Sequence, residues 1–81
     1  MSDLNHALID DLPDMKEEIH ALRQSDNHFA RLLDSYDDIS HQVALMEANV
    51  TPTTQETESG LKQQRVRLKD ELMRILNDSA A

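Results

Sequence analysis

Apolar residues recur along most of the chain at steps of three and four residues, which is the period of an α-helix and not that of a strand. The clearest stripe advances by alternating steps of three and four residues, which is the seam of three heptads. It consists of Phe29, Leu32, Tyr36, Ile39, Val43, Met46 and Val50. A second stripe with the same spacing consists of Leu61, Arg65, Leu68, Leu72 and Ile75. We therefore predict helices over residues 26–49 and 54–77.

Residues that cap or stop helices mark the ends of both segments. The side-chain oxygens of Ser25 and Asp26 can accept hydrogen bonds from the first turn of the middle helix. Pro52 ends that helix, and Thr53 followed three residues later by Glu56 has the form of a capping box for the next one. The segment between the helices is short and rich in turn residues, so the two helices should form an antiparallel hairpin.

A single register lets the two stripes face each other along their whole length. The predicted facing pairs are Met46–Leu61, Val43–Arg65, Ile39–Leu68, Tyr36–Leu72 and Leu32–Ile75. The same register brings Asp38 near Lys69 and Asp34 near Arg74, so we expect ion pairs across the hairpin. Arg65 is the charged member of the stripe, and its guanidinium either reaches Glu47 or Ser40 or turns out to the rim.

A shorter helix precedes the hairpin. Pro13 suits the first position of a helix over residues 13–24. Residues 1–12 form either a loose helical turn or a frayed, disordered arm. The sequence therefore predicts an all-α fold in which residues 13–78 form the hairpin domain and its N-terminal helix.

Composition and charge limit the classes of function that the chain is expected to have. The chain has 81 residues, a net charge of −8 and no cysteine. Residues 1–60 carry three basic and thirteen acidic side chains, whereas residues 61–81 carry five basic and three acidic ones. This balance disfavours binding to nucleic acid, which depends on neutralising phosphates. Because the chain has no export signal or membrane-spanning stretch, we expect a soluble, cytoplasmic protein that does not bind membranes.

Several runs of residues together form a recognisable pattern. The runs are Ile19–Leu22, Asp26–Phe29 with Leu32 and Tyr36, Glu47, Leu61–Lys62, and Arg65–Leu72. With these runs the chain resembles the YdcH-like family of small bacterial helical proteins over about residues 12–77, and Val66 departs from the family conservatively, since the family more often has Leu there. The resemblance implies a long helical hairpin and a bacterial cytoplasmic protein. The family is a domain of unknown function, so the resemblance implies no reaction, ligand or cofactor.

Residue types that carry chemistry are present, but their spacing does not favour a reaction. The four histidines, His6, His20, His28 and His41, contain no pair four residues apart, so we expect no metal site. The acidic residues of the middle helix lack a pocket that could perturb their pKa values, so we expect neither an enzyme nor a bound cofactor.

Surplus apolar residues point to protein interaction. A face made of Ile19, Leu22, Leu33, Met73 and Leu76 has no partner within the two-stripe seam. Either the first helix covers this face within one chain, or two copies share it. We favour self-association, with a dimer as the expected state and a helix of another protein as a further partner. The alternative function is a small regulator that contacts nucleic acid through the basic run Lys62, Arg65, Arg67, Lys69 and Arg74.

Overall fold

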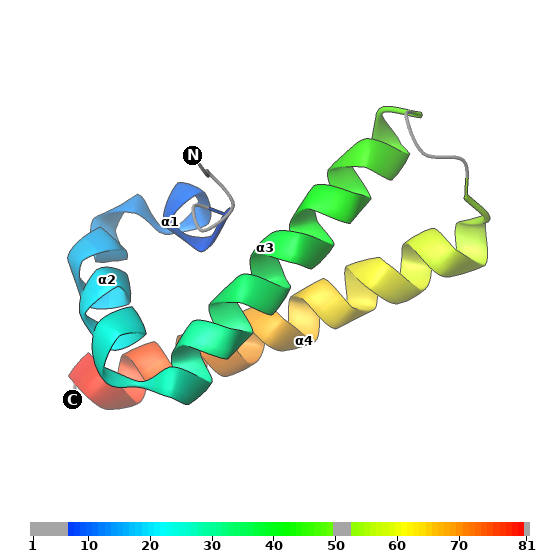
Figure 1. Ribbon diagram of the computed structural model, residues 1–81. Helices are drawn as coiled ribbons and strands as arrows, with labels where there is room; N and C mark the ends of the chain where they lie inside the picture. The colour runs from blue at the N-terminus through cyan, green and yellow to red at the C-terminus, as the bar shows by residue number, and fades with distance from the viewer. Residues whose placement is uncertain (1–6, 50–52, 81) are drawn as a thin grey trace.

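A computed structural model describes residues 7–49 and 53–80, and within these ranges every element is helical (Figure 1). In chain order the elements are α1 (Ala7–Asp11), the 3-10 turn η2 (Pro13–Met15), α2 (Lys16–Ser25), α3 (Asn27–Glu47) and α4 (Gln55–Ala80). The two long helices, α3 and α4, run antiparallel and pack against each other, which confirms the predicted all-α hairpin.

Local capping determines where the long helices begin. Asp26 precedes α3, and its carboxylate accepts a hydrogen bond from the backbone N–H of Phe29 at 3.1 Å, as predicted. At the start of α4 the hydroxyl oxygen of Thr54 accepts from the N–H of Thr57 at 3.1 Å. The cap is therefore Thr54, and the predicted capping box at Thr53 was displaced by one residue.

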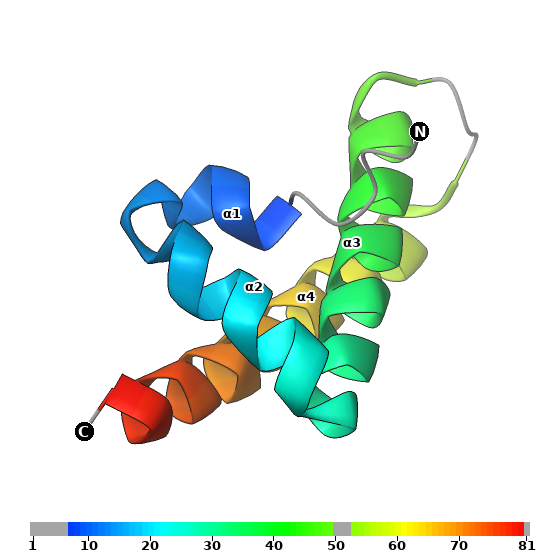
Figure 2. The same cartoon turned by 60° about the vertical axis from the view of Figure 1, so that its left-hand side comes forward.

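The N-terminal elements form a third layer on the hairpin. Figure 2 shows α1 and α2 together on one side of α3 and α4. Pro13 begins η2, as its fixed φ favours, and η2 leads directly into α2. Of the two alternatives for residues 1–12, the described part shows a helix, because Ala7–Asp11 form α1 and Leu8 is fully buried. Residues 1–6 lie outside the described residues.

The hydrophobic core lies between this third layer and the hairpin. Its buried members come from α1, α2, α3 and α4: Leu8, Ile9, Ile19, Phe29, Leu33, Tyr36, Leu72 and Leu76. Leu32, Leu68 and Ile75, which belong to the predicted seam, are only half-buried at its edge. Phe29, Tyr36 and Leu72 of the predicted seam do lie in this core, which extends beyond the seam toward the N-terminal elements, because α1 and α2 bury the apolar residues on their own side of the hairpin.

No helix within residues 7–49 and 53–80 combines the length and the apolar character that a membrane span requires.

Candidate functional site

The five residues predicted to form an interaction face do come together, but inside one chain. Ile19, Leu33 and Leu76 are each 1% exposed, and Leu22 and Met73 are half-buried against the same core. Helices α1 and α2 cover this side of the hairpin, which is the intrachain alternative and not the sharing between copies that the sequence analysis favoured. In the folded single chain Ile19, Leu33 and Leu76 are therefore interior, whereas Leu22 and Met73 keep part of their surface exposed.

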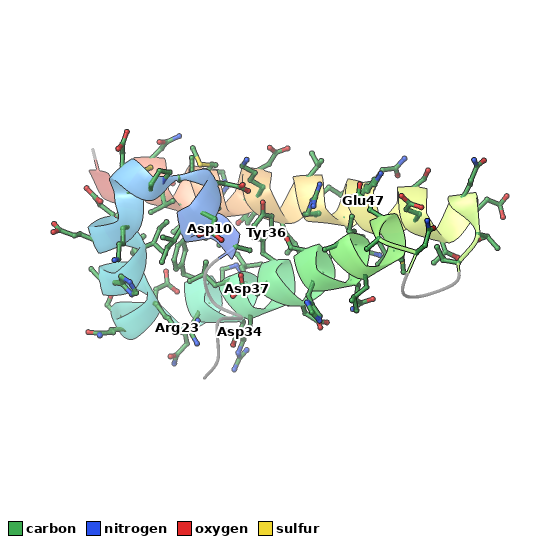
Figure 3. All side chains as sticks on the ribbon, turned by 90° about the horizontal axis from the view of Figure 1, so that it is seen from above. Asp10, Arg23, Asp34, Tyr36, Asp37 and Glu47 are labelled. Atoms are coloured by element: carbon green, nitrogen blue, oxygen red, sulfur yellow. The ribbon has the colours of Figure 1, made fainter. Side chains whose placement is uncertain are left out.

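Polar contacts fasten α1 to the hairpin on this covered side. The N–H of Ala7 donates to the Asp37 carboxylate at 3.0 Å, and Asp37 is only 3% exposed. The Tyr36 hydroxyl donates to the Asp11 carboxylate at 2.6 Å. Figure 3 shows Tyr36 and Asp37 beside α1. Two neighbouring residues of α3 thus bind both ends of the five-residue helix α1.

The environment of Tyr36 keeps its hydroxyl protonated. Burial raises the pKa of Tyr36 above its ordinary value, and the hydrogen bond to Asp11 and the negative charge of Asp11 raise it further. The guanidinium of Arg65 is close enough to act in the opposite direction. The hydroxyl therefore acts as a donor to Asp11 at neutral pH.

The opposite side of the hairpin carries an open groove between α3 and α4. The groove has a volume of about 370 Å³ and is lined by Ser35, Ile39, Gln64, Arg67 and Leu68. Ile39 and Leu68 are half-buried, and the three polar residues are exposed. Ile39 and Leu68 were predicted to face each other, and they do line one space. We call this space the uncovered groove.

Ion pairs engage two of the cations in the first part of α4. The Lys62 ammonium lies 3.0 Å from the Glu47 carboxylate and 3.1 Å from that of Glu58, and both partners raise the pKa of Lys62. The Lys69 ammonium lies 3.6 Å from the Asp11 carboxylate of α1. These pairs are largely exposed, so each contributes little stability, but they neutralise two cations of the basic run.

The other cations of α4 fall into two kinds. Arg74 pairs with Glu71 and, at 3.7 Å, with Asp78, and Glu71 raises the pKa of Arg74. Arg65 and Arg67 form no ion pair with any residue that the structure describes. Of the five basic residues in the proposed nucleic-acid run, three are therefore occupied by carboxylates of the same chain.

The predicted ion pairs across the hairpin are wrong. Asp34 pairs with Arg23 of α2 at 3.1 Å, and Arg74 pairs within α4. Figure 3 shows Arg23 and Asp34 close together. Lys69 pairs with Asp11, whereas Asp38 accepts a hydrogen bond from the Gln42 amide at 3.1 Å. The physical reason is the third layer, since α1 and α2 bring nearer partners to the hairpin.

The described residues contain no group of three or more metal-ligating side chains that could hold an ion.

Comparison with known proteins identifies one similarity. A family model described as "Protein of unknown function (DUF465)" matches residues 29–76, which run from the first turn of α3 to the last part of α4. The matched part is the hairpin and excludes α1, η2 and α2. No curated protein and no solved structure matches the chain.

Proposed function

Because the chain belongs to the DUF465 family, whose description assigns no function, we propose its function from its surfaces: it is a non-enzymatic interaction module that self-associates. The observation that supports this proposal is that the N-terminal helices cover only one of the two sides of the hairpin. One side is covered by α1 and α2, and the other carries the uncovered groove, which has Ile39 and Leu68 among its lining residues. A second copy of the chain is the occupant that we propose for this groove.

Charge supports a second copy as the occupant. Helix α3 carries one basic and four acidic side chains, whereas residues 61–80 of α4 carry five basic and three acidic ones. In a two-fold arrangement of antiparallel hairpins, α3 of one copy lies over α4 of the other, so opposite charges meet twice. Arg67 lines the groove, and Asp38 lies one turn along α3 from Ser35. These two residues are the proposed pair between copies.

Apolar spacing supports the same arrangement. Residues 32, 39 and 46 of α3 and residues 61, 68 and 75 of α4 repeat every seven positions, and all six are half-buried apolar side chains. Such a repeat on two adjacent helices fits the packing of a four-helix bundle. Two hairpins joined through the uncovered groove would bury these six side chains further. The small or uncharged polar side chains Ser35 and Gln64 would lie at the contact without introducing a buried charge.

The test places negative charge in the groove without disturbing the core. Ser35→Glu with Gln64→Glu changes two exposed residues that line the groove. His41→Glu with Gln63→Glu adds the same charge at exposed positions that lie away from it. Sedimentation equilibrium at about 100 µM, well above a micromolar dissociation constant, should show dimers for the unmodified chain and for the control. The groove variant should be monomeric.

A monomeric unmodified chain at this concentration would refute the proposal. Equal association of the two variants would place the contact outside the groove and would refute it as well. Circular dichroism of all three proteins shows whether the substitutions leave the helices intact, which is expected because all four positions are exposed.

The finer parts of the proposal rest on the sequence. We propose that the YdcH-like resemblance describes this same family and that the protein is bacterial and cytoplasmic. The alternative, contact with nucleic acid through the third predicted helix, is not favoured, because carboxylates occupy Lys62, Lys69 and Arg74. The mainly apolar floor and open form of the groove support binding of a helix more than they support catalysis.

A further inference from the structure

A second hollow lies between α1, α3 and α4. It has a volume of about 300 Å³ and is lined by Asp11, Tyr36, Arg65, Val66 and Lys69. This volume is at the lower end of the range typical of small-molecule sites. We call it the Arg65 hollow. It shares no lining residue with the uncovered groove.

Arg65 is the unexplained residue of this hollow. It occupies a position in the apolar stripe of α4 and is half-buried, yet it forms no ion pair with a described residue. Lys69, four residues along the same helix, places a second positive charge beside it, and like charges at this spacing repel. A half-buried, uncompensated arginine is costly unless an anion accompanies it. The hollow therefore has the electrostatics of an anion site.

The one carboxylate in the hollow is already engaged. Asp11 accepts from the Tyr36 hydroxyl at 2.6 Å and lies 3.6 Å from the Lys69 ammonium. Lys69 compensates the charge of Asp11, and the protonated Tyr36 holds the carboxylate in place. The positive charge of Arg65 is left over, because no carboxylate on a described residue lies within ion-pair distance of it.

The rim of the hollow is apolar at Val66. This residue is 56% exposed, and it is the large hydrophobic side chain that stands out as exposed among the described residues. An arginine presents paired N–H groups that match the two oxygens of a carboxylate. An exposed valine beside it offers a contact for an apolar group attached to that carboxylate.

We propose that the Arg65 hollow binds a small organic carboxylate that carries an apolar body. The carboxylate accepts hydrogen bonds from the Arg65 guanidinium, while the Lys69 ammonium stays paired with Asp11 and limits its repulsion of the ligand. The apolar body lies against Val66. This site does not depend on self-association through the uncovered groove, which uses different residues.

The test uses the full chain and follows its backbone amides by NMR during titration with sodium benzoate. Benzamide, which has nearly the same shape without the charge, is the neutral control, and inorganic phosphate is the control for a plain anion site. Benzoate should give saturable shifts centred on residues 11, 36, 65, 66 and 69, with a dissociation constant near the millimolar range. Benzamide should give none, and phosphate should bind more weakly than benzoate.

Variants separate this site from general charge attraction. Arg65→Gln should weaken benzoate binding by about tenfold or more. Arg74→Gln removes the same charge from an exposed position of α4 that lines neither the hollow nor the groove, and should leave the affinity nearly unchanged. Val66→Glu places a carboxylate at an exposed position on the rim, so it should abolish binding without affecting folding. This variant decides the question if Arg65→Gln fails to fold.

Three results would overturn the proposal. Equal binding of benzamide would remove the role of charge, and equal binding of phosphate would remove the role of the apolar body. An equal loss in the Arg65→Gln and Arg74→Gln variants would show that benzoate responds only to net charge. The groove variant Ser35→Glu with Gln64→Glu should bind benzoate normally, so failure of the self-association proposal leaves this test intact.

Discussion

Leu8→Ala measures whether the N-terminal segment belongs to the folded core. Leu8 is fully buried in the core, although it lies on α1, which has only five residues. A helix this short is not stable alone, so packing against the hairpin must hold it in place. The substitution removes three buried carbon atoms and leaves a cavity, because the rigid neighbours from α3 and α4 cannot close fully around it.

The magnitude follows from the burial of the side chain. Three carbon atoms at about 0.8 kcal/mol each correspond to about 2.4 kcal/mol of lost transfer free energy. The cavity increases this to about 3–5 kcal/mol. A domain of this length has a free energy of unfolding of about 4–12 kcal/mol. The variant should therefore lose a large share of its stability, and its Tm should fall by roughly 12 °C or more.

Thermal unfolding followed by circular dichroism measures this effect. Val66→Ala is the control, because Val66 is 56% exposed and its truncation should change stability by about 0.5 kcal/mol or less. If Leu8→Ala and Val66→Ala shift Tm equally, α1 does not pack as described and the third layer is not part of the core. The amide of Leu12, whose N–H donates to the Leu8 carbonyl at 2.8 Å, would then exchange without protection.

The remaining predictions concern a titration, the third layer and the groove. Folding raises the pKa of Tyr36, the single tyrosine, so the unfolded chain ionises first and stability falls above about pH 10, by up to about 1.4 kcal/mol per pH unit. Phenolate absorbance should show this delayed ionisation, and Tyr36→Phe should remove the slope. Deleting residues 1–25 should expose the apolar side of the hairpin and cause aggregation, measured by light scattering. Asp38→Arg and Arg67→Asp should each weaken association, and the double variant should restore it, as sedimentation can show.

Strong helical periodicity explains why the hairpin could be predicted. Asp26 caps α3 by accepting from the N–H of Phe29, only three residues later, so the local sequence is sufficient to place that boundary. The predicted cap of α4, Thr53, is one residue before the actual cap, Thr54. The two residues have the same side chain, so only the path of the backbone distinguishes them. Helix α1 is different, since Pro13 interrupts its stripe and its formation depends on distant packing.

The third layer also explains what sequence reasoning missed in the candidate sites. Ile19, Leu33 and Leu76 were recognised as one face, but the sequence left two possible covers for it, and the structure covers it within the chain. The uncovered groove could have been anticipated from Ser35 and Gln64. These two residues lie beside the facing pair Ile39–Leu68, and neither carries a charge. The Arg65 hollow could not, because its carboxylate and one wall come from α1.

Salt dependence distinguishes self-association from binding to nucleic acid. Two copies with a net charge of −8 each repel at long range, and salt weakens that repulsion because the Debye length falls from about 30 Å at 0.01 M to about 8 Å at 0.15 M. The proposed contact of Arg67 with Asp38 of the second copy acts over a shorter distance and is screened less. Association measured by sedimentation should therefore strengthen between these salt concentrations, whereas contact with phosphates would weaken steeply. Association that weakens over this range would show that long-range attraction dominates, which the proposed interface between two acidic chains does not allow.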